Sequence, residues 1–390
     1  MANEVVRYPN LREQIPMTSV DEYNTTNPQS ATTVMYSDGS RSDSEWLTLF
    51  RQLDRRQVGT IPLPELKHQM EANSDHFGLT QEERNRLLDG ADLDGDRRVD
   101  FGEFCIMMAK AKDMRAKRVM FRSAQMVSPR SLRQEYFSYL EQYNCLPPPV
   151  FLLIITIVEV IFYIYYAVEM KEGISVSGPV PTQSPLIYNP CRREEAWRYV
   201  SYMFIHIGIY HIVFNSIAQL GLGIPLELVH KFWRVGIVYV LGVLAGSLAV
   251  SVTDPRVYLA GASGGVYALI AAHAANLVVN WDEMEFAVPR LIFLVILLGT
   301  DVGVALYNRY GNTGVDPNSR VSYVAHIGGF VAGLLMGIVV LRNFKTKAWE
   351  RVVWWIALVG FILLVTLCVL WNIFYPQYCT KDTCRQICRY

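Results

Sequence analysis

Residues 258–269 read YLAGASGGVYAL, and the apolar character of this stretch continues to residue 279. A helix needs roughly 20 apolar residues to cross the hydrocarbon core of a bilayer, and the run 259–279 has that length. The serine between glycines also matches the nucleophile elbow of soluble hydrolases, which requires a strand, a turn and a helix on a parallel sheet. Here the serine opens an apolar run with short loops on both sides. The sequence therefore predicts a membrane span and not a hydrolase elbow.

Six further apolar runs of similar length occupy most of the chain after residue 149. They cover residues 150–169, 201–221, 233–252, 289–306, 321–342 and 353–375. Only helices and closed barrels satisfy all backbone hydrogen bonds inside lipid, and runs of this length fit helices. The expected fold class is therefore all-α, a polytopic membrane helix bundle of seven spans.

Charge and the polar N-terminal part narrow the possible classes. The 390 residues contain 36 Lys+Arg and 36 Asp+Glu, so the basic excess expected of a nucleic-acid partner is absent. No apolar signal core precedes residue 150, and we expect the N-terminal part to stay in the cytosol. The basic loop Arg342–Arg351 then agrees with the positive-inside rule, and seven spans leave the C-terminus outside.

Four cysteines would face the extracytosolic side. They are Cys191, Cys379, Cys384 and Cys388. An even number of cysteines in an oxidising compartment makes disulfides plausible, and free thiols are the alternative. The sequence does not determine the pairing.

Polar side chains also interrupt the second predicted span. Residues 204–219 read FIHIGIYHIVFNSIAQ, in which His211 and Asn215 are four apart and so share one helix face. The spacing contains no HExxH motif, so a zinc protease is not indicated. The pair could donate hydrogen bonds to a developing oxyanion, or it could simply join two helices.

Two more polar side chains, His326 and Glu159, lie within predicted spans. Polar groups are costly in lipid, so each is expected to have a specific role. Residues 324–333 read VAHIGGFVAG, so His326 lies one turn into the sixth span, followed by Gly329 and Gly333 on a face that lets another helix approach. Glu159 lies in the middle of the first span. For both side chains a hydrogen-bonded structural role is the plain interpretation, and for Glu159 we favour it.

Taken together, these groups suit one reaction. The predicted topology puts Ser263 and His326 near the outer ends of the fourth and sixth spans. A serine hydroxyl needs a base within hydrogen-bond reach, and a neutral histidine serves at neutral pH. His211, Asn215 and the Ser263 N–H could stabilise a tetrahedral oxyanion. No acidic residue is obviously placed to complete a triad, so the sequence predicts a Ser–His dyad.

The motifs around these residues resemble the rhomboid intramembrane serine proteases. In chain order they are Trp197-Arg198, His206…His211…Asn215, LGIPLE at 222–227, GASG at 261–264 and Ala325-His326…Gly329…Gly333. The resemblance covers residues 148–376 and implies the rhomboid fold, a six-span core with one extra C-terminal span. That extra span is similar to the secretase-type members of the secretory pathway.

The resemblance implies a catalytic dyad, an oxyanion-stabilising pair and three supporting residues. These are Ser263 and His326; His211 and Asn215; and Tyr267, Gly261 and His206. Inactive relatives often carry proline just before the serine, whereas this chain has Ala262, so activity is expected. The implied substrates are single-pass transmembrane proteins, such as growth-factor precursors of EGF receptor signalling, cut near the extracytosolic face at the plasma membrane or Golgi. No cofactor is implied for catalysis.

A separate motif precedes the spans. Residues 92–103 read DLDGDRRVDFGE and align with a 12-residue EF-hand calcium loop. The expected ligands are Asp92, Asp94, Asp96, the Arg98 carbonyl, Asp100 and Glu103. Arg97 replaces the usual glycine at a position that favours positive φ, which weakens the expected affinity. The earlier loop 54–65 (DRRQVGTIPLPE) lacks oxygen donors at its third and fifth positions, so we expect it to pair without binding calcium. A folded pair without metal is the alternative.

The expected organisation has five parts. They are a disordered tail (1–44), an EF-hand pair (45–108), a basic juxtamembrane linker (109–147), the rhomboid domain (148–376) and a cysteine-rich extracytosolic tail (377–390). The basic stretch Lys110–Arg133 suits the anionic inner leaflet, the groove of an EF-hand or a solvated helix. We hypothesise that calcium repositions this helix and shifts protease activity. A non-catalytic, calcium-responsive membrane adaptor is the alternative function.

Overall fold

The computed structural model describes residues 41–72, 79–125, 127, 149–176, 178–253, 257–284, 286–310, 323–341 and 348–375. The predicted tail 377–390, with Cys379, Cys384 and Cys388, lies outside these residues, as do residues 1–40 and most of the linker after α5. The chain divides into two compact units, one made of 1–74 and 84–108 and the other of 75–83 and 109–390.

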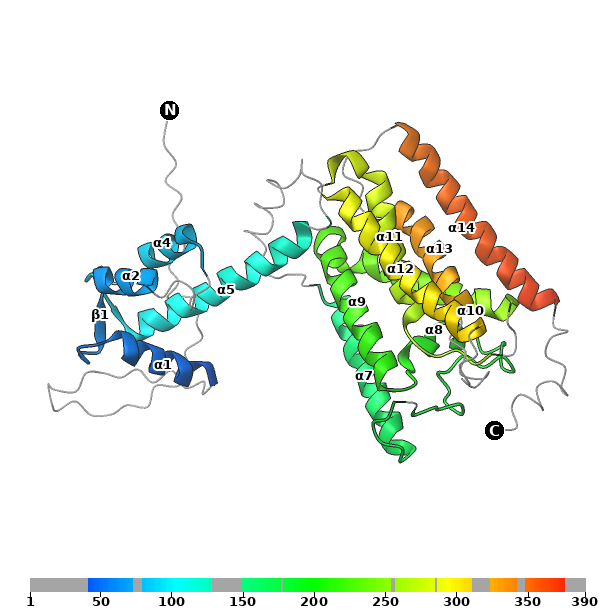
Figure 1. The fold of residues 1–390 in the computed structure, drawn as a ribbon, viewed down its shortest axis with the longest axis horizontal. Coiled ribbons are helices and arrows are strands. Elements are labelled where there is room, and N and C mark those ends of the chain that lie inside the picture. Colours follow the sequence, from blue (N-terminus) through cyan, green and yellow to red (C-terminus); the bar gives the residue numbers. More distant parts are fainter. Residues whose placement is uncertain are drawn as a thin grey trace, which may run out of the picture. The chain divides into compact units, whose positions relative to one another are not determined.

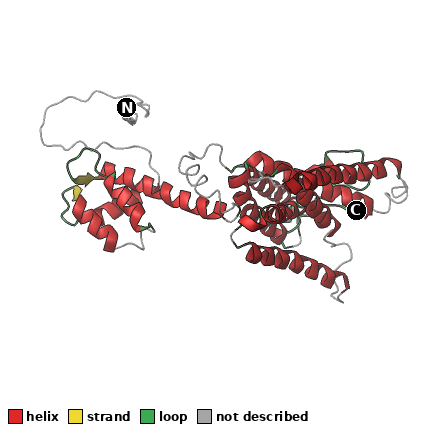
Figure 2. Cartoon of the chain, turned by 90° about the horizontal axis from the view of Figure 1, so that it is seen from above, coloured by secondary structure: helices red, strands yellow, loops and turns green. Residues whose placement is uncertain are grey.

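The first unit contains two helix–loop–helix segments whose loops pair. Its elements are α1 (Arg41–Leu53), β1 (Thr60–Pro62), α2 (Leu63–Ala72), α4 (Gln81–Asp89), β2 (Arg98–Asp100) and the start of α5 (Phe101–Gln125). The strands, visible in Figure 2, are antiparallel with Ile61 opposite Val99, and both side chains are buried. Helix α1 begins four residues before the predicted boundary at residue 45.

The second unit contains the apolar helices. Five of them are long and apolar enough to cross a membrane: α7 (Phe151–Glu169), α9 (Ile209–His230), α10 (Phe232–Thr253), α13 (Tyr323–Val340) and α14 (Ala348–Phe374). Helix α11 (Ser263–Val279) and the apolar part of α12 (Ala287–Tyr310), residues 287–300, are shorter. Each of the seven predicted runs thus overlaps an apolar helix, and five of these helices have spanning length among the described residues.

The predicted boundaries of the second span were wrong. Residues Arg198–Ser201 form the short helix α8 and Tyr202–Phe204 form a 3₁₀ turn, η3; the long helix α9 begins only at Ile209. Gly208, with φ 81°, separates these segments. A helix residue has φ near −63°, so the chain cannot run through Gly208 as one helix.

Close backbone contact between α11 and α13 forms the centre of the bundle, and the two helices lie beside α10 (Figure 1). A Cβ atom added at Gly329 or Gly333 would overlap the backbone of Gly264 or Ala268 on α11. This confirms the predicted role of the two glycines, because only a missing side chain permits such close approach. Helix α14 lies at the edge of the bundle, and few of its residues are buried.

Glu159 is fully buried within a polar network that joins three helices. Its carboxylate accepts hydrogen bonds from Gln219 Nε2 and Tyr239 Oη, both at 3.2 Å, and Tyr239 Oη also lies 2.6 Å from Gln219 Oε1. Gln219 Nε2 donates as well to Thr156 Oγ1. The network supports the structural interpretation of Glu159, since a satisfied buried polar group holds its neighbours in place.

The segment before α8 is fixed by Arg198. Its guanidinium is buried, donates to the carbonyl oxygens of Ser184 and Ile187 at 2.8 Å, and pairs with Glu195 at 2.5 Å. Trp197 is more than half exposed, and its Nε1 donates to the Pro185 carbonyl.

Candidate active site

Ser263 is the first residue of α11 and is half-buried. The residues before it form a tight turn in which Gly261 has φ 113°, a conformation that L side chains rarely adopt. Backbone hydrogen bonds hold the approach to this turn, because Leu259 pairs with Tyr188 in both directions at 3.1 and 3.2 Å. The serine therefore lies where an apolar helix meets a fixed loop.

His326, on α13, lies against the serine helix. Its ring stacks on the ring of Tyr267, with centroids 4.2 Å apart and an interplanar angle of 13°. Tyr267 is four residues after Ser263 on α11, so both side chains leave the same face of that helix. His326 is buried, and the structure thus brings the predicted base to the helix face that carries the predicted nucleophile.

His211 approaches the same turn from α9. A Cβ atom added at Gly261 would lie 2.5 Å from His211 Cε1 and 2.6 Å from Nε2, so the imidazole occupies the space that the missing side chain leaves. Asn215 is one turn further along α9, buried, and on the same helix face as His211. The histidine therefore lies beside the residues that lead into Ser263.

His206 completes the polar surroundings of this turn. Its Nε2 accepts a hydrogen bond from the Ala262 N–H at 3.4 Å, and its ring contacts that of His211 with centroids 5.1 Å apart. The side chain is 1% exposed. The predicted site residues come from α9, α11, α13 and the loop before α9. They gather around the turn 261–263 and the first turns of α11.

One residue at this segment was missed by sequence reasoning. The Tyr202 carbonyl accepts a hydrogen bond from the Gly261 N–H at 3.1 Å. Tyr202 lies inside an apolar run, and a single tyrosine there is indistinguishable from an ordinary core aromatic. Its importance depends on a contact between residues 59 positions apart in the chain.

The second helix–loop–helix segment contains an acidic cluster. One carboxylate oxygen from each of Asp92, Asp94 and Asp96 lies within 4.8 Å of the others, a spacing and donor type that suit a calcium ion. Arg97 has φ 63°, which confirms that this position adopts the left-handed conformation expected of it. Glu103 accepts hydrogen bonds from the Leu93 and Asp100 N–H groups at 2.7 and 3.0 Å.

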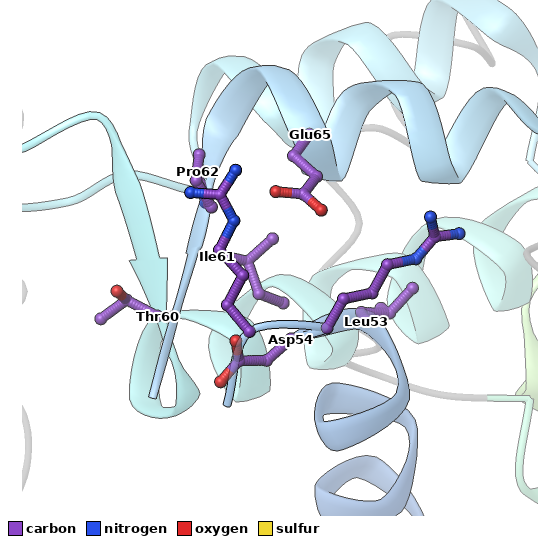
Figure 3. Close-up of a pocket in the computed structure, with 8 residues that line it drawn as sticks. Leu53, Asp54, Thr60, Ile61, Pro62 and Glu65 are labelled. Carbon is purple, nitrogen blue, oxygen red and sulfur yellow. The ribbon is translucent and has the colours of Figure 1, made fainter. Parts of the chain in front are cut away.

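The first loop differs in charge, because arginine side chains lie beside its acidic residues (Figure 3). The carboxylate of Asp54 accepts hydrogen bonds from the Val58 and Gly59 N–H groups at 3.3 and 2.8 Å, as the carboxylate of Asp92 does from the Gly95 and Arg97 N–H groups. Asp54 and Glu65 line a small pocket together with Arg55 and Arg56. The positive charges of Arg55 and Arg56 at this pocket disfavour the binding of a calcium ion there.

The second unit is a bundle of apolar helices, as in a polytopic membrane protein. It also contains the serine turn and the histidine stacked on Tyr267. Residues 193–343 match the Rhomboid domain model. The chain is 37% identical to "Inactive rhomboid-related protein 2" of Caenorhabditis elegans over 84% of this chain and 92% of the relative. It is 34% identical to "Rhomboid-related protein 3" of Homo sapiens over 85% and 88% of the two chains.

A further relative, "Rhomboid-related protein 2" of Mus musculus, is 46% identical over 61% of this chain and 79% of its own length. The chain belongs to the rhomboid family and is a multi-pass membrane protein. The name of the C. elegans relative describes that protein as inactive, so membership by itself does not assign catalysis to this chain.

Proposed function

We propose that the protein is a secretase-type intramembrane serine endopeptidase with a Ser263–His326 dyad. The observation that carries the proposal is the stacking of His326 on Tyr267, one turn beyond Ser263 on the same helix face. That arrangement supplies a positioned base beside a hydroxyl at the start of a helix, which are the two requirements of an activated serine.

The reaction proceeds in two halves. Ser263 Oγ attacks the scissile carbonyl carbon while the neutral His326 imidazole takes the hydroxyl proton, and the resulting oxyanion accepts hydrogen bonds from His211, Asn215 and the Ser263 N–H. The C–N bond breaks, and the imidazolium returns its proton to the leaving amine. A water molecule then attacks the acyl ester, His326 accepts its proton and passes it to Ser263 Oγ, and the carboxylic acid product leaves.

The substrates are single-pass transmembrane proteins, with growth-factor precursors as the favoured class. A substrate helix must unwind near the extracytosolic face to expose its backbone, because every peptide carbonyl in an intact helix is already hydrogen-bonded. Seven spans, a cytosolic N-terminus and an extracytosolic C-terminus at the plasma membrane or Golgi fit this proposal.

We further propose that the first unit is an EF-hand pair and that its second loop binds regulatory calcium. The ligands would be Asp92, Asp94, Asp96, the Arg98 carbonyl, Asp100 and Glu103, and the bound ion would neutralise their mutual repulsion. The end of α5 supports a link to activity: Ala124, in its last turn, and Val127, two residues beyond its end, are buried in the core of the second unit. The Val127 carbonyl accepts a hydrogen bond from Asn276 Nδ2, near the end of α11, at 2.9 Å.

A non-catalytic, calcium-responsive adaptor that binds transmembrane clients is the second candidate. The relative named as inactive favours it. The two functions differ in whether Ser263 is reactive. The test is to treat the purified full chain with a fluorophosphonate probe and map the modified residue by peptide mass spectrometry. Modification of Ser263 that His326→Ala abolishes supports the protease, whereas an unmodified Ser263 in folded protein supports the adaptor.

A further inference from the structure

The turn before Ser263 is held from one side by a short segment of the chain, residues 202–206. The Gly261 N–H donates to the Tyr202 carbonyl at 3.1 Å, and the Ala262 N–H donates to His206 Nε2 at 3.4 Å. These are the two residues directly before the serine. The position of Ser263 therefore depends on where this segment lies.

Tyr202 fixes the segment to the bundle through its side chain. The ring is 1% exposed, and its hydroxyl donates to the Val243 carbonyl on α10 at 2.8 Å. One residue thus links α10, through its hydroxyl, to the serine turn, through its carbonyl. Because the ring is buried and its hydroxyl is hydrogen-bonded, the side chain anchors the Tyr202 backbone to α10.

Glycines make the space in which the hydroxyl lies. A Cβ atom added at Gly264 would lie 2.8 Å from Tyr202 Oη, and one at Gly246 would lie 3.2 Å from it. Gly264 is the residue directly after Ser263. The hydroxyl therefore packs against the serine helix as well as against α10. Tyr202 thus contacts the chain on both sides of Ser263, Gly261 through its carbonyl and Gly264 through its hydroxyl.

We propose that Tyr202 is a positioning residue for Ser263. The hydrogen bond from its hydroxyl to Val243 fixes the position of its own backbone carbonyl, which accepts the hydrogen bond from the Gly261 N–H. The inference rests on the proposed function, because the residue it positions is the proposed nucleophile. If Ser263 moves by about 1 Å from its base, the rate of its attack on the substrate can fall strongly. Substrate binding depends on other contacts and should change little.

The test is Tyr202→Phe, which keeps the ring and removes the hydroxyl. Val243 keeps its place inside α10, so the variant is expected to fold. We expect kcat and the rate of fluorophosphonate labelling of Ser263 to fall together by roughly tenfold, with KM unchanged within about twofold. Faster hydrogen exchange in residues 257–263 is expected as well, since the Gly261 N–H is held less firmly.

Tyr239→Phe is the matched control. It removes the same atom from another fully buried tyrosine, whose hydroxyl bonds to Glu159 and Gln219 and not to a residue next to the turn. It should lower the melting temperature and leave the labelling rate per folded molecule unchanged. Wild-type kcat and labelling in Tyr202→Phe, or equal losses in both variants, would overturn the inference.

The two proposals fail separately. Wild-type protein that is folded but unlabelled at Ser263 contradicts the protease. Hydrogen exchange then decides the Tyr202 inference alone: exchange in residues 257–263 that is the same in wild type and Tyr202→Phe rejects it, and faster exchange in the variant upholds the positioning of the turn.

Discussion

The His211 imidazole lies in the space left by the missing side chain of Gly261, with Cε1 only 2.5 Å from the position a Cβ atom would take. Gly261 has φ 113° and is two residues before Ser263. A single glycine thus permits both the turn that presents the serine and the approach of a proposed oxyanion donor.

Gly261→Ala should therefore reduce activity strongly. The added methyl group displaces His211 and strains the backbone by about 1–3 kcal/mol. We expect kcat/KM for a model transmembrane substrate to fall roughly 10- to 100-fold. Gly360→Ala on α14 is the control, because a Cβ atom there meets nothing within 4 Å. Equal activities in the two variants would show that His211 needs no such space.

Glu227 holds the start of α7 from a distant part of the chain. Its carboxylate accepts hydrogen bonds from the Phe151 and Leu152 N–H groups at 3.3 and 2.8 Å, two of the donors that a helix N-terminus leaves unpaired. Glu227→Gln should lower the free energy of unfolding by about 1–2 kcal/mol, because the amide keeps only one of the two acceptor oxygens and is a weaker acceptor than a carboxylate.

Thermal unfolding in detergent measures this effect. The control is Glu169→Gln, which removes an exposed carboxylate from the last turn of the same helix. An apparent melting temperature that falls no further for Glu227→Gln than for Glu169→Gln would mean that the cap contributes nothing to stability.

Calcium binding should depend on the second loop alone. Titration calorimetry of the full chain is expected to detect one site, which Asp92→Ala combined with Glu103→Gln removes. The first-loop variant Asp54→Asn should keep that site, because Asp54 lies in the other loop beside Arg55 and Arg56 and is not one of the proposed ligands. Substrate cleavage by wild type should differ between calcium and chelator. Cleavage that stays flat across calcium concentrations would reject regulation, and binding that survives the double substitution would reject the ligand assignment.

The parts of the fold that follow from local rules were predictable. Run length predicted the apolar helices, and the spacing of Gly329 and Gly333 predicted the close contact with α11. Hydropathy could not locate the start of the second span, because the mostly apolar stretch 202–207, which contains η3, continues without interruption into the sequence of α9. The break at Gly208 depends on a backbone angle that composition does not reveal.

The site was predictable where it rests on chemically unusual residues. Polar side chains are costly within apolar runs, so a serine and three histidines there indicate a specific role. The structure brings His206, His211 and His326 to the serine turn or its helix. Tyr202, the partners of Glu159 and the cap formed by Glu227 were not predictable. Each depends on a contact across many positions of the chain, and nothing in the local pattern marks either partner.

The most direct test of the account is cleavage of a model single-pass substrate by the purified protein in lipid vesicles, with Ser263→Ala measured beside it. The protease assignment predicts a cleaved product with wild type, cut near the extracytosolic face, and none with the variant. Product formed equally by both proteins would show that the cleavage is not the work of Ser263. No product from wild-type protein that is folded and binds the substrate would contradict the protease and favour the adaptor.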